Sequence, residues 1–175
     1  ARRLIGQKAL SPVELTDSCI ERIEAVDGSV NAMVTRCFER AQSEAKAAEA
    51  AVMQGNALGA LHGLPMGVKD LNVTEGVLTT YGSPMHAENV PAKDERIIAA
   101  LREAGAIVIG KTTTSEFGCK PVGDSPLTGI TRNPWNRDKT PGGSSAGAGA
   151  SIAAGVMPFG LGTDGGGSIR IPCSL

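Results

Sequence analysis

Glycine is concentrated at one end of this 175-residue chain, where ten of its 23 glycines fall between residues 142 and 167. Glycine loses more conformational freedom on folding than any other residue, so it is used where the backbone needs a positive φ or must approach another group closely. The two densest runs are Gly-Gly-Ser-Ser at 142–145 and Gly-Gly-Gly-Ser at 165–168. Several amides of such a turn can point at one developing negative charge beside a serine hydroxyl, which is what acyl transfer requires.

Composition limits what the chain can bind. The sequence is 41% hydrophobic and 20% charged, with a formal net charge of −1, which is typical of a globular domain with a real core. A net charge near zero gives no electrostatic reason to expect nucleic acid or an anionic membrane as a partner. No apolar run reaches the roughly 20 residues of a membrane span. Function classes that depend on these partners are therefore not expected.

The cysteines and histidines give no sign of a metal site. The four cysteines and two histidines are scattered along the sequence, whereas metal sites and disulfide frameworks need clustered, paired spacing. We therefore expect no bound metal. We expect the thiols to be free, as in a reducing cytoplasm.

The hydrophobic pattern alternates between helices and short apolar strands. Ser-Pro-Val-Glu at 11–14 is a capping box that begins a helix to about residue 25. Further helices are predicted at about 38–53, 94–103 and 145–154, and extended segments at about 32–35, 64–71, 106–109 and 157–161. This alternation predicts an α/β fold with a largely covered sheet.

Three motifs match known functional patterns but have the wrong surroundings. Residues 105–112 fit a phosphate-binding loop, yet the four central residues are apolar and belong inside a sheet. Residues 143–147 fit a nucleophile elbow, but no strand precedes them and both histidines lie upstream. Ser43 and Lys46 fit a Ser-x-x-Lys pair in a polar, alanine-rich helix that is more typical of a solvated surface. Because residues 105–112 do not fit a phosphate-binding loop in this context, we expect Lys111 to be a strand-end lysine.

Without a usable histidine, a serine nucleophile needs another base. Lys69 follows the apolar run 64–68, and burial favours the neutral form of a lysine, which can accept a proton. The alternative is an ion pair between Lys69 and Asp70 or another carboxylate at the end of the strand. Spacing alone leaves both interpretations open.

Five motifs, in this order along nearly the whole chain, resemble those of the amidase signature family. They are Gly-Leu-Pro-Met-Gly-Val-Lys-Asp at 63–70, Gly-Lys-Thr at 110–112, Asn-Pro-Trp at 133–135, Gly-Gly-Ser-Ser at 142–145 and Gly-Thr-Asp-Gly-Gly-Gly-Ser-Ile-Arg at 162–170. Each motif alone is weakly specific, whereas five in register are specific. The resemblance implies an α/β/α layered fold with a central mixed sheet covered by helices, and an amidase that uses no cofactor.

The resemblance also implies the catalytic roles. Lys69 would be the base, Ser144, at a cis peptide bond, would relay the proton, and Ser168 would be the nucleophile. Ser168 would attack an amide carbonyl, and water would then hydrolyse the acyl-enzyme.

Neighbouring residues are implied to support these three groups. Those expected to form the oxyanion hole or bind substrate are Gly165, Gly166, Gly167 and Gly118, the last with Phe117 at the border of the acyl pocket. Those expected to brace the glycine turn are Ser145, Asp164 and Arg170. The alternative for Asp164 and Arg170 is an ordinary surface ion pair. Trp135 is expected to be a packing residue.

We expect residues 1–175 to form a single amidase-signature domain, with motifs from about 63 to 175. Because members of the family are much longer, the chain is expected to be an N-terminal portion with an incomplete sheet at its C-terminal end. The leading function is cytoplasmic hydrolysis of a small-molecule amide, with no nucleic acid or membrane partner and with a homodimer left open. The alternatives are the A subunit of a glutamyl-tRNA(Gln) amidotransferase, which is a glutaminase within a complex, and a truncated, inactive scaffold.

Overall fold

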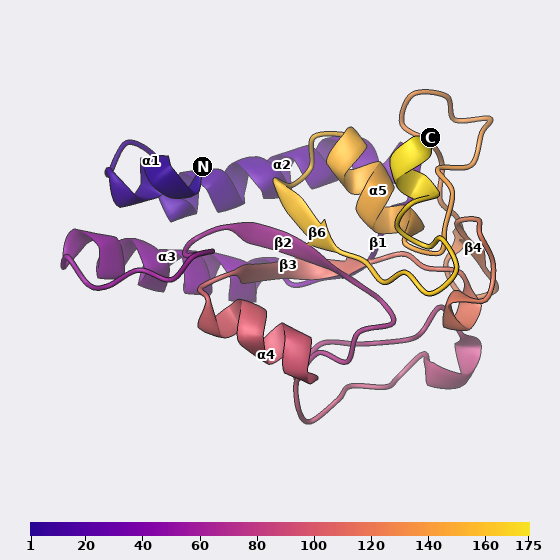
Figure 1. The fold of residues 1–175 in the computed structure, drawn as a ribbon, viewed down its shortest axis with the longest axis horizontal. Coiled ribbons are helices and arrows are strands. Elements are labelled where there is room, and N and C mark those ends of the chain that lie inside the picture. Colours follow the sequence, from indigo (N-terminus) through magenta and orange to yellow (C-terminus); the bar gives the residue numbers. More distant parts are fainter.

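The computed structural model describes residues 1–175 and is built around a four-stranded sheet (Figure 1). Its strands are β1 (Met33–Arg36), β2 (Pro65–Lys69), β3 (Ile107–Thr112) and β6 (Phe159–Leu161). Their order in space is β1-β3-β2-β6. β3 and β6 run parallel to β2, while β1 runs antiparallel to β3. The predicted mixed sheet is therefore confirmed.

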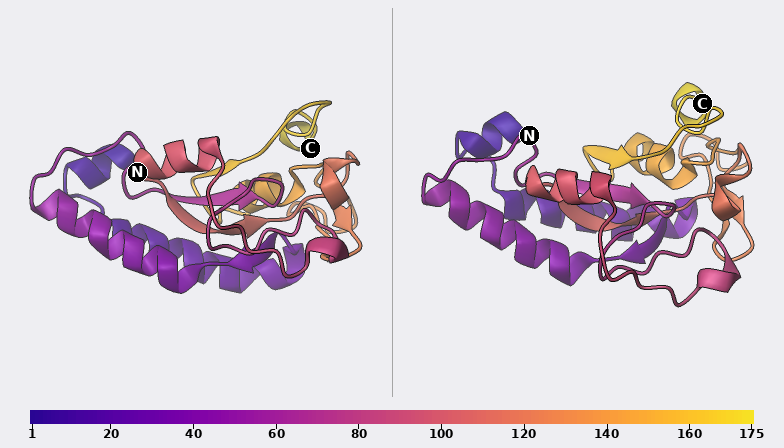
Figure 2. Two further views of the ribbon diagram at one scale, coloured as in Figure 1. Left: turned by 90° about the horizontal axis from the view of Figure 1, so that it is seen from below. Right: turned by 60° about the horizontal axis from the view of Figure 1, so that its bottom comes forward.

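Helices lie on both faces of this sheet (Figure 2). α2 (Pro12–Val30) and α3 (Phe38–Met53) pack together on one face, and α5 (Ala146–Ala153) packs on the same side. α4 (Arg96–Glu103) covers the other face. None of the helices combines the length and the apolar character that crossing a membrane requires.

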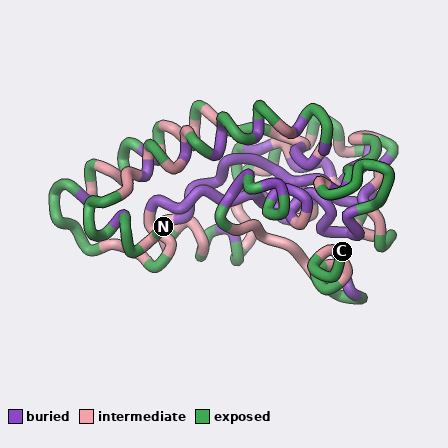
Figure 3. The backbone as a smooth tube through the Cα atoms, turned by 90° about the horizontal axis from the view of Figure 1, so that it is seen from above, coloured by how far each residue is buried: buried purple, intermediate pink, exposed green.

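The two faces of the sheet bury separate apolar clusters. Successive side chains of a strand point to opposite faces, so Ile107 and Ile109 of β3 join the α2–α3 cluster. Val108 instead packs with Met66 of β2 and Ile98 of α4. Every residue of β2 and β3 is buried (Figure 3). Burial on both faces is what parallel strands require, and it places the ends of these strands in a water-poor environment.

α2 begins as predicted but ends later. The Ser11 hydroxyl accepts hydrogen bonds from the N–H groups of Val13 and Glu14, and the Glu14 carboxylate accepts from the Ser11 N–H, which confirms the capping box. The helix continues to Val30 and ends where Asn31 adopts a left-handed conformation with φ 55°. The predicted end near residue 25 is wrong, because the last turns of the helix bury the side chain of Val30.

The surroundings of residues 105–112 exclude the phosphate-loop interpretation. Gly105 follows α4 with φ 92°. The apolar residues after it form the strand β3, whereas a phosphate-binding loop needs this stretch to be a flexible loop. Lys111 is confirmed as a strand lysine. The strand extends three residues past its predicted end at residue 109, because Lys111 and Thr112 are buried there despite their polarity.

Several short elements and one packing prediction differ from the sequence analysis. The elements not predicted are α1 (Arg2–Gly6), the paired strands β4 (Asp124–Ser125) and β5 (Gly129–Ile130), and 3-10 turns at Pro84–His86, Glu116–Gly118 and Pro172–Ser174. All are too short to show a hydrophobic period. The packing role expected of Trp135 is wrong, since this residue is 80% exposed. The buried Asn133 side chain accepts a hydrogen bond from the backbone N–H of Trp135 at 2.9 Å. This bond holds the turn while the indole ring is exposed to solvent.

The glycines of α5 and α2 give a matched prediction. A Cβ at Gly147 would lie 2.3 Å from both the Ala32 carbonyl oxygen and the Thr113 nitrogen, whereas a Cβ at Gly28 would meet nothing within 4 Å. We expect Gly147→Ala to lower the free energy of unfolding by about 1–3 kcal/mol through overpacking. Gly28→Ala should raise it by about 0.5 kcal/mol because alanine favours helix. Urea denaturation measures both, and equal effects would contradict the close packing of α5.

Candidate active site

The carboxyl ends of the parallel strands meet at one edge of the sheet. β2 ends at Lys69, and β6 leads after one glycine into Thr163. Ser144 is brought to the same edge by the turn that precedes α5, after a cis peptide bond between Gly143 and Ser144. The next turn of the chain returns Ser168 to this point, where the Ser145 N–H donates to the Ser168 carbonyl oxygen at 3.2 Å. Distant parts of the sequence thus converge here.

Three side chains form an unbroken series of hydrogen bonds. Lys69 Nζ lies 2.8 Å from Ser144 Oγ, and Ser144 Oγ lies 3.0 Å from Ser168 Oγ. Lys69 and Ser144 are buried, while Ser168 is half-buried. The series therefore runs from the interior of the fold towards its surface, and a proton can move along it.

Burial lowers the pKa of Lys69 to about 8, although the negative charge of Asp164 partly opposes this shift. The amine also lies 2.9 Å from the hydroxyl of Thr163. Hydroxyl groups can donate to a neutral amine as well as accept from an ammonium group. The environment of Lys69 thus accommodates the neutral form, which the proton-accepting role requires.

The alternative ion pair between Lys69 and Asp70 is absent from the structure. The Asp70 carboxylate instead accepts from the N–H and the hydroxyl of Thr80 and lies 3.9 Å from Lys111 Nζ. Lys111 is also fully buried, and burial lowers its pKa to about 8 as well. Geometry rather than pKa distinguishes the two lysines, because only Lys69 contacts the serines.

Thr163 belongs to this site and was not singled out from the sequence. Besides its contact with Lys69, its carbonyl oxygen accepts from the Ser145 hydroxyl at 3.2 Å, and its N–H donates back to that hydroxyl at 3.3 Å. Ser145 thereby ties the turn before α5 to the segment after β6. The position of Thr163 in the Gly-Thr-Asp motif was the available signal, but its contact with Lys69 depends on the pairing of β6 with β2.

The glycine turn is organised around Asp164. Its carboxylate accepts from the N–H groups of Gly167 at 2.7 Å, Ile169 at 3.1 Å and Arg170 at 3.1 Å. The Arg170 guanidinium adds two contacts at 3.0 and 2.8 Å. These interactions, with the guanidinium foremost, hold the pKa of Asp164 well below its usual range. The Arg170 side chain is 75% exposed, so its contact with Asp164 is a surface ion pair. The Asp164 carboxylate also binds the backbone of the glycine turn.

The expected oxyanion donors differ in their hydrogen bonding. Among Gly165, Gly166 and Gly167, the N–H of Gly167 donates to Asp164 at 2.7 Å. The N–H groups of Gly165, Gly166 and Ser168 have no hydrogen-bond partner in the structure. Gly165 and Gly166 are also exposed. These three N–H groups are therefore free to donate to a ligand.

Gly118 lies against Ser144. A Cβ at Gly118 would approach Ser144 Oγ to 3.2 Å and Leu71 Cδ1 to 2.7 Å, and Gly118 has φ +68°. Both the close approach and the backbone conformation therefore require glycine. The neighbouring Phe117 is 52% exposed, and its ring stacks on Tyr81 with the centroids 6.4 Å apart.

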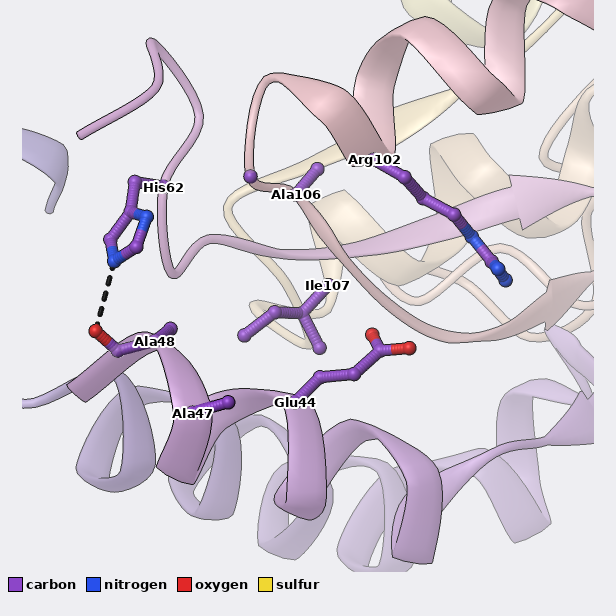
Figure 4. A pocket seen from close by; sticks show the side chains of 8 residues that line it. Glu44, Ala47, Ala48, His62, Arg102, Ala106 and Ile107 are labelled. Carbon is purple, nitrogen blue, oxygen red and sulfur yellow. Dashed lines mark hydrogen bonds between the residues drawn. The ribbon is translucent and has the colours of Figure 1, made fainter. Parts of the chain in front are cut away.

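The histidines lie outside this cluster. His62 lines a cavity of about 360 Å³ beside α3 and the amino end of β3, at the opposite edge of the sheet (Figure 4). Its Nε2 lies 2.9 Å from the Ala48 carbonyl oxygen. His86 packs edge-on against Tyr81. Neither histidine contacts the serines, whereas Lys69 is hydrogen-bonded to Ser144.

The Asp164–Arg170 pair generates a second matched prediction. Asp164→Ala removes the acceptor of the Gly167 N–H, and we expect amide hydrogen exchange at Gly167 to accelerate at least about tenfold, because hydrogen bonds to a carboxylate are strong. Arg170→Ala removes only an exposed partner, which contributes little, so exchange should change less than about threefold. Similar acceleration in both variants would show that the ion pair, rather than the carboxylate, holds the turn.

Comparison with known proteins places this geometry in a family. The amidase family model matches residues 14–175. The chain is 47% identical over 172 residues to the A subunit of the glutamyl-tRNA(Gln) amidotransferase of Moorella thermoacetica, and 42% identical over 172 residues to the putative amidase AmiB2 of Mycobacterium tuberculosis. These alignments cover 98% of this chain but only 35% and 37% of the two relatives. The chain thus spans about a third of the length of the curated relatives that it matches.

Solved structures agree with this assignment. A bacterial aryl acylamidase of the amidase signature family superposes with a TM-score of 0.92 at 35% identity, covering 98% of this chain and 36% of that one. The native peptide amidase from Stenotrophomonas maltophilia gives a TM-score of 0.91 at 30% identity, with the same coverage. The extent of the family match, together with these likenesses, shows that the chain belongs to the amidase signature family.

Proposed function

We propose that this chain carries the catalytic centre of an amidase that hydrolyses the C–N bond of a small carboxylic amide through an acyl-enzyme. The observation that supports this function best is the series Lys69 Nζ–Ser144 Oγ–Ser168 Oγ, with spacings of 2.8 and 3.0 Å. Positioned proton transfer of this kind contributes typically about 10²–10⁴-fold to a rate.

In the first step, Ser168 Oγ forms a bond to the carbonyl carbon of the amide while its proton passes to Ser144 Oγ. Ser144 gives its own proton to neutral Lys69, and the carbonyl π electrons move onto the oxygen. The N–H groups of Gly165, Gly166 and Ser168 are the donors available to this oxyanion. Each such donor is worth about 2.7–4 kcal/mol of barrier in other enzymes.

The tetrahedral intermediate then collapses and the C–N bond breaks. The leaving nitrogen takes a proton from Ser144, which is reprotonated by the Lys69 ammonium group. Water attacks the acyl-enzyme with the same groups acting in the same order, and Ser168 is released as the free hydroxyl. Thr163, at 2.9 Å from Lys69 Nζ, keeps the amine directed at Ser144 throughout.

A second function is favoured by one of the relatives. The 47% identical protein of Moorella thermoacetica is named as the A subunit of a glutamyl-tRNA(Gln) amidotransferase. With this function, the same serine attacks the side-chain amide of glutamine, and the ammonia is passed on within a complex. Glutamine hydrolysis that appears only with partner subunits would favour this function, while hydrolysis of simple amides by the protein alone would favour an amidase.

Covalent labelling tests the proposed nucleophile. We expect a fluorophosphonate to label the protein at Ser168, and Ser168→Ala to abolish the labelling. Lys69→Ala should slow labelling by about 10²–10⁴-fold, because the general base is lost. Intact-protein mass spectrometry measures the modification and peptide mapping locates it.

Ser43→Ala is the matched control, since Ser43 and Lys46 in α3 have the Ser-x-x-Lys spacing without contact with the site. Labelling of this variant should equal that of the parent. Absence of labelling in the parent would favour the inactive scaffold, and labelling at a serine other than Ser168 would refute the assigned nucleophile.

A further inference from the structure

Lys111 is a second buried lysine, and the proposed reaction makes no direct use of it. It is fully buried in β3, and its Nζ donates to three oxygens of a single segment. These are the carbonyl oxygen of Asn72, the hydroxyl of Thr74 at 2.9 Å and the hydroxyl of Thr79 at 3.0 Å. Three acceptors match the three N–H bonds of an ammonium group. A buried charge needs such partners to offset its desolvation.

Asp70 fastens the two ends of the same segment to each other. Its carboxylate accepts from the Thr80 N–H at 3.1 Å and from the Thr80 hydroxyl, and lies 3.9 Å from Lys111 Nζ. Its carbonyl oxygen accepts from the Tyr81 N–H at 3.1 Å. Residues 70–81 therefore form a closed loop, hereafter the 70–81 loop, with Lys111 bonded to its interior.

The far end of the 70–81 loop reaches Ser144 through a backbone contact. The Tyr81 carbonyl oxygen accepts from the Phe117 N–H at 2.8 Å. Phe117 and Gly118 both have left-handed conformations, with φ of 49° and 68°, so this stretch of backbone depends on its contacts to stay in place. Gly118 in turn lies so close to Ser144 that a Cβ would be 3.2 Å from Ser144 Oγ. A shift of the loop is thus passed on to the surface that borders the Ser144 hydroxyl.

On the basis of the proposed function, we propose that Lys111 is a positioning residue for the reaction. Through the 70–81 loop it holds Phe117 and Gly118 against Ser144. This contact keeps the Ser144 hydroxyl between Lys69 and Ser168. Lys111 itself exchanges no proton with the substrate. Its partners Thr74 and Thr79 carry out the same function, since they are the side chains through which Lys111 holds the loop.

The test removes two of the three acceptors without changing the shape of the core. In the variant Thr74→Val/Thr79→Val, we expect amide hydrogen exchange at Phe117 to accelerate at least about tenfold, since hydrogen bonds to a charged group are lost. Labelling of Ser168 by a fluorophosphonate should slow about tenfold, with the pH midpoint of labelling unchanged because Lys69 is untouched. The variant Thr74→Ser/Thr79→Ser keeps both hydroxyls and should restore both rates to within about threefold of the parent.

Thr16→Val is the matched control, because Thr16 is a fully buried threonine of α2 whose hydroxyl has no hydrogen-bond partner. It should change neither exchange at Phe117 nor labelling. If the double valine variant is less stable but keeps the parent exchange and labelling rates, the positioning role is refuted. Should that variant not fold, Thr79→Val alone carries the same comparison. A parent protein that is not labelled refutes the proposed function, while exchange at Phe117 still decides whether Lys111 holds the loop.

Discussion

The burial of a lysine amine at the end of β2 is the constraint on which the site depends. An amine in water is charged and cannot accept a proton, whereas Lys69 is fully buried and its amine contacts the hydroxyls of Ser144 and Thr163. Desolvation then lowers its pKa to about 8. In the proposed mechanism the sheet therefore does more than carry the motifs, because the burial of Lys69 favours the neutral amine that would act as the base for Ser168.

Close approach of the backbone is the second requirement. The turn before α5 packs so tightly that a Cβ at Gly143 would lie 2.4 Å from the Val122 carbonyl oxygen. Gly118 also lies against Ser144, where a Cβ would be 3.2 Å from Ser144 Oγ. These glycines let loops from distant parts of the chain meet at one hydroxyl. Asp164 completes the arrangement by accepting the N–H groups of Gly167, Ile169 and Arg170, while those of Gly165, Gly166 and Ser168 stay free.

The sequence predicted the elements with a clear hydrophobic period and the residues within distinctive motifs. Lys69, Ser144 and Ser168 lie together as the resemblance implied, and the capping box at Ser11 was correct. Contacts that depend on tertiary pairing could not be predicted. Thr163 meets Lys69 only because β6 pairs with β2, and the bond from Gly167 to Asp164 follows from the path of one turn. The exposure of Trp135 likewise depends on how the turn at Asn133 is anchored, which no local pattern reports.

The basicity of Lys69 can be measured by NMR titration of lysine-labelled protein, with the signal assigned by its loss in Lys69→Arg. We expect a midpoint near pH 8. The rate of Ser168 labelling should rise through the same midpoint and then level off, because the neutral amine formed above it is the base. A Lys69 amine that titrates at the ordinary value of 10.5, or a labelling rate that does not follow its deprotonation, would show that Lys69 is not the base for Ser168.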